Sequence, residues 1–240
     1  MALIAGLAYT PAAAVECNEI IHDGTTFTVC EVDATSQDIR LFLNDASGAP
    51  YGQFSAVERD LALEGMALQF AMNGGMYHED RTPVGYFVEA GEELMRVIDS
   101  PGPGNFGLVP NGIFCIRDNR ADVIETLNFL RDAPACNYAT QSGPMLVIDG
   151  ELHPRFLEDG TSTFIRNGVG TSAEGSRAVF AISQTQVNFY SFGTLFRDTL
   201  ALPNALFLDG NISRLYAPQI DRDDFGRRMG PIVGVISTLD

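Results

Sequence analysis

The sequence has no tryptophan and only three histidines in 240 residues. Without tryptophan it lacks the broad aromatic platform on which many proteins stack polysaccharide chains, so that class of function is disfavoured. It also has no Gly-x-Ser-x-Gly pattern, which, with so few histidines, argues against a serine hydrolase. Neither Cys-x-x-Cys nor a Cys/His spacing occurs, so the sequence indicates no zinc site.

Long hydrophobic runs are also missing beyond the N-terminus. No later window approaches the roughly 18 apolar residues that a membrane helix needs, so no membrane span is predicted. The first 14 residues are almost wholly apolar or small and end in Pro11-Ala12-Ala13-Ala14. This is typical of a signal peptide cleaved after Ala14, although a basic start is missing and a buried first strand or helix is the alternative. We expect a signal peptide over 1–14 and one domain over 15–240.

Basic residues are scarce, with 15 Lys and Arg against 31 Asp and Glu, a net charge of −16. Such a field repels nucleic acid, and no basic stripe offsets it. An anionic substrate requires that a few arginines be focused in one cleft.

Four cysteines permit three pairings, and sequence alone does not choose among them. Cys17 and Cys30 flank a predicted hairpin that turns at 22–24, which favours a Cys17–Cys30 bridge. A second bridge would then join Cys115 and Cys136. An even cysteine count after a signal peptide fits a periplasmic or secreted protein. The alternative is four buried free thiols in a cytosolic protein.

Strand patterns outnumber helix patterns along the chain. A capping-box spacing, with Ser55 as N-cap and Glu58 three residues on, predicts a helix over 55–64. A second helix is expected over 192–200. Strands are expected at 26–32, 39–43, 66–72, 85–89, 93–98, 112–117, 121–125, 146–148, 151–152, 178–183, 187–190, 205–208 and 232–236. The pattern predicts a single α+β domain with a mixed or antiparallel sheet core and a few flanking helices.

Several short apolar strands run into loops of small polar residues. Glycine in such loops lets the backbone approach a ligand closely, so we expect the site at these strand ends. Each pattern alone is also an ordinary turn. The loops lie at 71–77, 141–145 and 206–213, with a related segment at 165–170.

Taken in order, these segments resemble the phosphodiester glycosidase family, in particular its short exported bacterial branch. The similarity runs from about Asn73 to Tyr216. It implies an exported hydrolase that cleaves a sugar-1-phosphodiester bond and releases the sugar from a phosphodiester-linked glycoconjugate. The blocks that carry it are Asn73-Gly74-Gly75-Met76-Tyr77, Gln141-Ser142-Gly143-Pro144, Arg166-Asn167-Gly168-Val169-Gly170 and Leu208-Asp209-Gly210-Asn211-Ile212-Ser213.

The chemistry of such a bond suggests catalytic roles. The leaving group is an anionic phosphate, so cleavage requires an anion clamp and a carboxylate more than a strong acid. Asp209 is the expected carboxylate, because an apolar strand delivers it to a strand end. Arg166 is the expected clamp, since a guanidinium can bind two phosphate oxygens at once. His153 is the expected general acid, with His78 as the alternative.

Substrate-binding groups are expected in the same loops. Main-chain N–H groups of the glycine turns would donate to the anion, and amide and hydroxyl side chains would bind sugar hydroxyls. The residues are Asn73, Gly74, Gly75, Tyr77, Gln141, Ser142, Gly143, Asn167, Gly210 and Ser213.

Other interpretations stay open at this stage. Arg166 could pair with Glu158 or Asp159, and Asp209 could only cap a turn. The chain could also be a non-catalytic envelope protein that binds a ligand on the same fold. No cofactor and no metal ligand are predicted, although several acids near the last motif offer oxygen ligands for calcium without the EF-hand spacing. Those acids are Asp209, Asp221, Asp223 and Asp224.

Overall fold

A computed structural model of the chain describes residues 14–209 and 212–239. All of the predicted signal peptide except Ala14 lies outside the described residues, and so does the predicted substrate-binding residue Gly210. The strands are β1 (Glu16–His22), β2 (Thr25–Asp33), β3 (Asp38–Phe42), β4 (Met66–Asn73), β5 (Phe87–Glu89), β6 (Glu92–Met95), β7 (Gly112–Arg117), β8 (Arg120–Glu125), β9 (Tyr138–Ser142), β10 (Met145–Ile148), β11 (Glu151–Leu152), β12 (Asn167–Thr171), β13 (Arg177–Ser183), β14 (Asn204–Asp209), β15 (Leu215–Ala217), β16 (Arg222–Asp223) and β17 (Ile232–Thr238).

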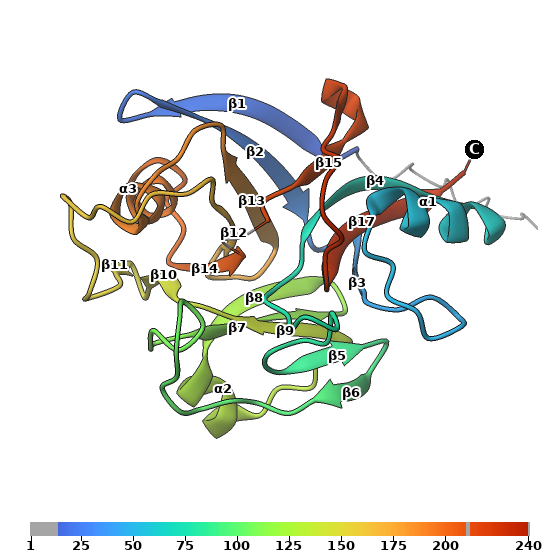
Figure 1. Cartoon of the computed structure of the whole chain (residues 1–240), viewed down its shortest axis with the longest axis horizontal. Coiled ribbons are helices and arrows are strands. Elements are labelled where there is room, and N and C mark those ends of the chain that lie inside the picture. The colour runs from blue at the N-terminus through green and yellow to red at the C-terminus, as the bar shows by residue number, and fades with distance from the viewer. Residues whose placement is uncertain (1–13, 210–211, 240) are drawn as a thin grey trace, which may run out of the picture.

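These strands form three sheets (Figure 1). A seven-stranded sheet has the order β1-β2-β13-β12-β14-β10-β11, and two five-stranded sheets have the orders β16-β15-β4-β17-β3 and β6-β5-β9-β7-β8. We name the smaller two the β4 sheet and the β9 sheet. All neighbouring strands in the three sheets run antiparallel. The predicted α+β class with an antiparallel core is confirmed.

One shared hydrophobic core joins the sheets. At its centre Phe180 of the seven-stranded sheet lies 4.8 Å from Phe70 of the β4 sheet and 5.8 Å from Phe114 of the β9 sheet, measured between ring centroids. All three rings are fully buried. Because each sheet buries an aromatic ring in this shared core, the three sheets form a single domain.

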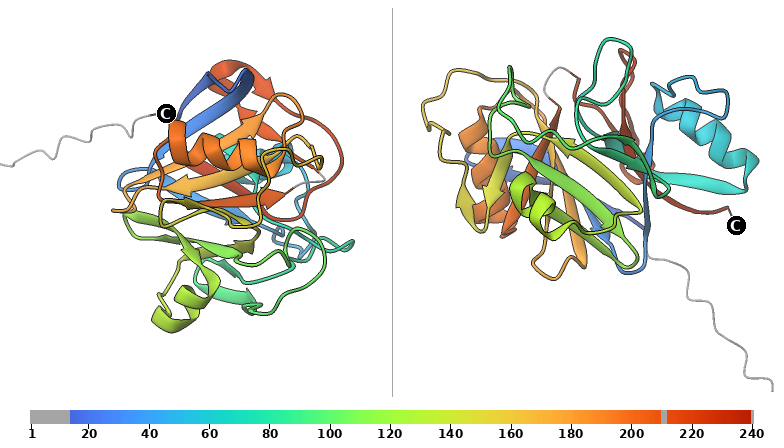
Figure 2. Two further views of the ribbon diagram at one scale, coloured as in Figure 1. Left: turned by 90° about the vertical axis from the view of Figure 1, so that its left-hand side faces the viewer. Right: turned by 90° about the horizontal axis from the view of Figure 1, so that it is seen from below.

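The helices cover the outer faces of the sheets (Figure 2). Helix α1 (Phe54–Leu63) packs on the β4 sheet, α2 (Thr126–Asp132) on the β9 sheet, and α3 (Phe189–Thr194) on the seven-stranded sheet. Two short turns complete the elements: a π-helical turn η1 (Leu195–Thr199), which continues α3, and a 3₁₀ turn η2 (Pro218–Ile220).

Two local predictions differ from the structure. Helix α1 begins after Gln53, which makes no side-chain capping bond, and Glu58 instead accepts a hydrogen bond from the hydroxyl of Tyr216. The capping box is therefore wrong, because a tertiary partner takes the glutamate. The strand predicted over 187–190 is also wrong, since Asn188 caps α3 by accepting from the main-chain N–H of Ser191 at 2.9 Å.

Both predicted disulfides are present. Cys17 and Cys30 face each other in the register of β1 and β2, and Cys115 on β7 is bonded to Cys136, which follows α2. Across residues 14–209 and 212–239, no helix is long and apolar enough to cross a membrane.

Candidate functional site

The predicted site loops meet where the three sheets converge. Ser142, at the end of β9, donates from Oγ to the main-chain oxygen of Leu208 at 2.8 Å. Asn167, at the start of β12, donates from Nδ2 to the main-chain oxygen of Asp209 at 3.1 Å. Asn73, at the end of β4, places Nδ2 3.5 Å from Oδ2 of Asp209. The end of β14 is therefore held by side chains from every sheet.

Asp209 occupies the centre of this arrangement. The residues before it on β14 are buried in apolar surroundings, and its own exposed fraction is only 7%. The register of β12 and β14 shifts between the pairs Asn167–Asp209 and Gly168–Phe207, which leaves Leu208 as an extra residue. Such a bulge turns a side chain away from the regular alternation. The predicted delivery of Asp209 by a buried strand agrees with this geometry.

Ser213 also lies at the end of β14, with its Oγ 3.5 Å from the main-chain oxygen of Asp209. Its Oγ donates to the main-chain oxygen of Ile165 at 2.8 Å and accepts from Nδ2 of Asn167 at 2.9 Å. The buried Oδ1 of Asn167 has no hydrogen-bond partner within the described residues. Asn167, Ser213 and Asn73 are thus brought together around Asp209, as the sequence predicted.

Arg214 anchors the neighbouring segment and was missed by the sequence analysis. Its main-chain N–H donates to Oδ1 of Asn73 at 2.7 Å. Its buried guanidinium donates to the main-chain oxygens of Asp224 and Arg227, the latter at 3.2 Å. Burial lowers the pKa of this group. Its position directly after the last motif was the signal that could have found it.

Tyr77 lies on the other side of the site, with its ring against Gly230. A Cβ on Gly230 would come within 2.5 Å of the Tyr77 side chain, so glycine is required there. The hydroxyl of Tyr77 is 3.5 Å from the main-chain oxygen of Arg228. Burial, followed by the charge of Asp209, raises the pKa of Tyr77 to about 12. Tyr77 therefore lies in the field of Asp209 and keeps its proton at neutral pH.

Three of the four predicted glycines lie within the described residues, and all three are closely packed. The N–H of Gly74 donates to the main-chain oxygen of Pro231 at 2.7 Å, so it is not available to a ligand as predicted. A Cβ on Gly75 would lie 2.4 Å from Oγ1 of Thr140, and one on Gly143 would lie 2.7 Å from Cβ of Asn111. Gly75 also has a φ of 144°, which side chains rarely adopt.

Gln141 has a different role from the one predicted. Its Oε1 accepts from the main-chain N–H groups of Tyr86 and Ile98, at 3.0 and 2.9 Å. Its Nε2 donates to the oxygen of Ile98 at 2.7 Å and to Oγ1 of Thr126 at 3.1 Å. The amide has two donors and two acceptor sites, and all are used. No hydrogen-bonding capacity is left for a sugar hydroxyl, and Gln141 instead ties the loop at Ile98 to β9.

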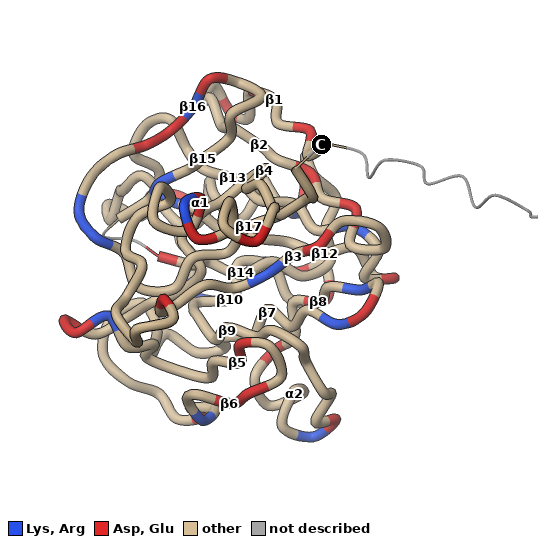
Figure 3. The backbone as a smooth tube through the Cα atoms, turned by 90° about the vertical axis from the view of Figure 1, so that its right-hand side faces the viewer, with Lys and Arg blue, Asp and Glu red and all other residues tan. Residues whose placement is uncertain are grey.

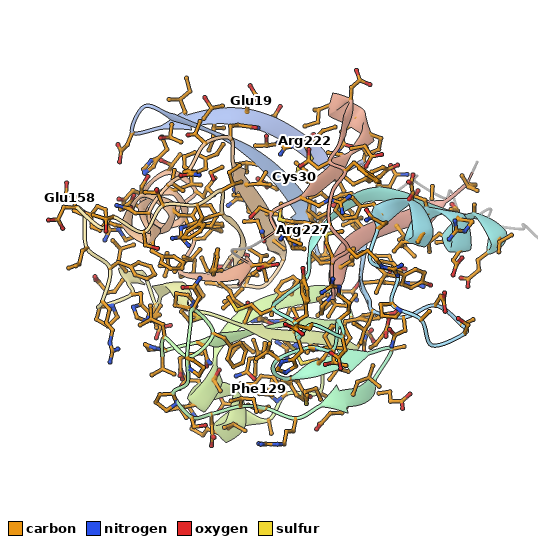
Figure 4. All side chains as sticks on the ribbon, viewed as in Figure 1. Glu19, Cys30, Phe129, Glu158, Arg222 and Arg227 are labelled. Carbon is orange, nitrogen blue, oxygen red and sulfur yellow. A yellow bond between two sulfur atoms is a disulfide. The ribbon has the colours of Figure 1, made fainter. Side chains whose placement is uncertain are left out.

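Arg166 is closed off from solvent, and its guanidinium contacts main-chain oxygens and aromatic rings. Its Nε donates to the oxygen of Val187 at 2.9 Å, and its guanidinium carbon lies 3.5 Å from the ring centroid of Phe189. The alternative pairing with Glu158 is not seen either, because that side chain lies at the outer edge of the molecule (Figure 4). Burial alone lowers the pKa of Arg166 to about 10. We therefore do not assign the phosphate clamp to Arg166.

His153 belongs to the same aromatic stack. Its ring lies 4.8 Å from that of Phe156, which in turn lies 5.1 Å from Phe189. Its Nδ1 accepts from the main-chain N–H of Arg155 at 3.3 Å. Burial lowers the pKa of His153, so the buried ring is neutral at pH 7. The contacts of His153 place it in this packing layer and not beside Asp209.

Two open hollows lie away from Asp209. One of about 390 Å³ is bordered by 34–39 and 116–119, and one of about 580 Å³ lies between β1, β2 and β16. Neither gathers the motif residues, so we place the site at Asp209 on chemical grounds. Within the described residues, no three His, Cys, Asp or Glu side chains gather to hold a metal ion. Asp224, one of the acids considered for calcium, is paired with Arg222 at 2.9 Å.

Solved structures with similar folds include an enzyme. The catalytic domain of zebrafish N-acetylglucosamine-1-phosphodiester alpha-N-acetylglucosaminidase, auto-inhibited by its pro-peptide, matches with a TM-score of 0.64 and 14% identity over 95% of this chain and 85% of that one. A hypothetical protein from Synechocystis matches with a TM-score of 0.64 and 12% identity over 92% of this chain and 61% of that one. A putative exported protein from Burkholderia pseudomallei K96243 has a TM-score of 0.56 and 10% identity, covering 88% and 74%. At these identities the likeness concerns the fold.

Comparison of sequences identifies the family as well as the fold. The uncharacterized protein YigE of Escherichia coli (strain K12) is 32% identical over 212 residues, which is 88% of this chain and 82% of YigE. Residues 66–235 match the family model described as phosphodiester glycosidase, a span that contains all four motifs. The resemblance suggested by those motifs is confirmed, and the chain belongs to the phosphodiester glycosidase family.

Proposed function

We propose that this protein hydrolyses a sugar-1-phosphodiester bond, with Asp209 as the catalytic carboxylate. The observation that carries the proposal is the position of Asp209, which side chains from all three sheets hold at one strand end. A carboxylate fixed in this way has the rigidity that catalysis requires, because its position is set by packed strands and not by a mobile loop.

The reaction breaks the bond between C1 of the sugar and its phosphate oxygen. The bonding electrons leave with the phosphate as a phosphomonoester, and a water oxygen bonds to C1 while losing a proton. Asp209 would accept that proton or stabilise the positive charge that develops at C1. The name of the zebrafish enzyme describes removal of N-acetylglucosamine from a 1-phosphodiester, and the shared fold supports a related chemistry here.

We further propose that the protein works outside the cytoplasm, in the periplasm or after secretion. Both disulfides join well-packed elements, and all four cysteines are used. Structural disulfides of this kind form and persist in oxidising compartments. The natural substrate would then be an exported glycoconjugate.

The test is to incubate the protein lacking residues 1–14 with a panel of sugar-1-phosphodiesters, including nucleotide sugars, and to measure released sugar. Asp209→Asn should lower turnover by at least about 100-fold, because the amide can neither take a proton nor stabilise positive charge. Asp149→Asn, in an exposed turn, is the matched control and should remain active. Binding without turnover across the panel would reject the proposal and favour the ligand-binding alternative.

A further inference from the structure

An anionic substrate poses an electrostatic problem for a protein of net charge −16. All fifteen basic residues are arginines, and several are neutralised by an adjacent acid. The paired ones are Arg40, Arg117, Arg120, Arg131, Arg177, Arg197 and Arg222. The phosphate must therefore be held by arginines that are not paired and that lie near Asp209.

Arg81 is the first of two such arginines. It lies in the loop that follows the Asn73-Gly74-Gly75 motif, with its guanidinium carbon 5.2 Å from the ring centroid of Tyr77. Within the described residues its guanidinium makes one hydrogen bond, from Nη1 to the main-chain oxygen of Glu79 at 3.2 Å. The nearby carboxylate of Asp80 accepts from Thr82 instead. Arg81 also has a φ of 77°, an unfavourable conformation for a long side chain, so a smaller residue would suit the turn better.

Arg227 is the second. It is exposed, and within residues 14–209 and 212–239 its side chain has no ion pair or hydrogen bond. Its main chain is fixed, because Arg214 donates to its oxygen at 3.2 Å. The next residue, Arg228, places its own main-chain oxygen against the hydroxyl of Tyr77. Figure 4 labels Arg227 near the middle of the molecule, between β14 and β17.

The two loops lie on one side of the molecule. The right-hand view of Figure 2 shows the loop 77–83 and the loop 224–230 on the same side of the molecule as the end of β14. Figure 3 shows that basic segments (blue) are scattered among acidic ones (red). Geometry links both loops to Tyr77: the guanidinium of Arg81 lies over its ring, and its hydroxyl reaches the main-chain oxygen of Arg228, next to Arg227. The charges of Asp209, Arg81, Arg214 and Arg227 all act on Tyr77, but the guanidinium of Arg214 is taken up by main-chain oxygens.

We propose that Arg81 and Arg227 bind the phosphate of the substrate. This inference rests on the proposed function and assigns to these residues the clamp that the sequence alone suggested for Arg166. A guanidinium group can bind two phosphate oxygens at once. The negative charge on the phosphate increases when the C1–O bond breaks. Both arginines should therefore stabilise the transition state more than the bound substrate, and kcat should fall more than KM rises when either is removed.

The experiment measures binding of inorganic phosphate by calorimetry, independently of any turnover. The variants are Arg227→Gln and Arg81→Asn, since asparagine tolerates the left-handed backbone at position 81. Each should weaken phosphate binding by about tenfold or more. The control is Arg96→Gln, because Arg96 is also unpaired within the described residues but contacts only the oxygen of Val97.

Unchanged phosphate affinity in both variants, an equal loss in the Arg96→Gln control, or no binding by the unmodified protein would overturn the inference. Loss of binding in both variants, with thermal midpoints unchanged, would support it. If that loss is found but no sugar-1-phosphodiester is hydrolysed, the anion site stands and the proposed reaction fails. The two proposals can therefore be judged separately.

Discussion

Asn167 donates a hydrogen bond from its side-chain amide to the main-chain oxygen of Asp209, at 3.1 Å. The same two residues are partners across β12 and β14. The bond therefore fixes the main chain of the proposed catalytic residue from the adjacent strand, where the β-bulge has removed the regular pairing. Asn167 acts as a positioning residue, because its amide reaches the backbone of Asp209 and not its carboxylate.

The first prediction concerns this bond. Asn167→Ala should lower the free energy of unfolding by about 1–3 kcal/mol, because the buried oxygen of Asp209 loses its best donor. Turnover should fall as well, since Asp209 is no longer held. Urea unfolding and the sugar-release assay measure the two effects.

Asn204→Ala is a matched control for this prediction. Asn204 lies at the other end of β14 and accepts from the main-chain N–H of Asp149 at 3.0 Å. Asn204→Ala should lower the free energy of unfolding and leave turnover unchanged. Equal losses of turnover in both variants would mean that general destabilisation, and not the positioning of Asp209, explains the result.

The second prediction concerns Gln141, whose amide joins β9 to the loop at Ile98. Gln141→Met keeps the volume but removes the acceptor for two main-chain N–H groups. The free energy of unfolding should fall by about 2–4 kcal/mol. Hydrogen exchange at Ile98 and Tyr86 should accelerate more than at the strand centres.

Gln69→Met provides the comparison, since Gln69 makes a single bond to Oγ of Ser237 at 2.9 Å. Gln69→Met should lower the free energy of unfolding much less than Gln141→Met. Normal exchange at Ile98 in the Gln141 variant would show that the loop does not depend on this amide.

The fold and the position of Asp209 at a strand end were predictable from local patterns. Alternating apolar residues indicate antiparallel strands wherever they occur, and the apolar run before Asp209 predicts a buried strand that ends at that carboxylate. Asn73 follows a predicted strand in the same way, whereas the strand that begins at Asn167 was not predicted. The convergence of the motifs was expected from their resemblance to the family and not from local patterns.

The roles of the arginines were not predictable in this way. Whether a guanidinium faces a ligand or a phenylalanine depends on packing between distant segments, and Arg166 meets Phe189 through tertiary contact. Arg81 and Arg227 carry no local pattern, because they lie in two loops far apart in the sequence. Gln141 was misassigned for the same reason, since its partners Tyr86 and Ile98 lie 55 and 43 residues away.

The third prediction concerns the disulfides. The loop closed by Cys115 and Cys136 spans 21 residues, so replacing both by serine should cost about 3 kcal/mol of unfolding free energy through the greater freedom of the unfolded chain. Thiol counting should find none before reduction and four after it, because all four cysteines are bonded. Four reactive thiols in the native protein would contradict both the bridges and the proposed location.

The fourth prediction concerns pH and His153. Burial holds the pKa of this histidine below its ordinary value of 6.5, so the unfolded chain binds more protons than the folded one once the pH falls below that value. Stability from His153 is therefore fully present above pH 6.5 and is lost as the pH falls through the lower, folded pKa. Glutamine cannot be protonated, so His153→Gln should lack this contribution. As the pH falls from 7.5 to 5, the unfolding free energy of the variant should therefore rise relative to that of the unmodified protein. His78→Gln, at an exposed position, serves as the control for the histidine-to-glutamine change itself and is measured in the same way. A difference that stays constant across this range would mean that His153 titrates normally in the folded protein, and that the stack with Phe156 does not exclude the charged ring.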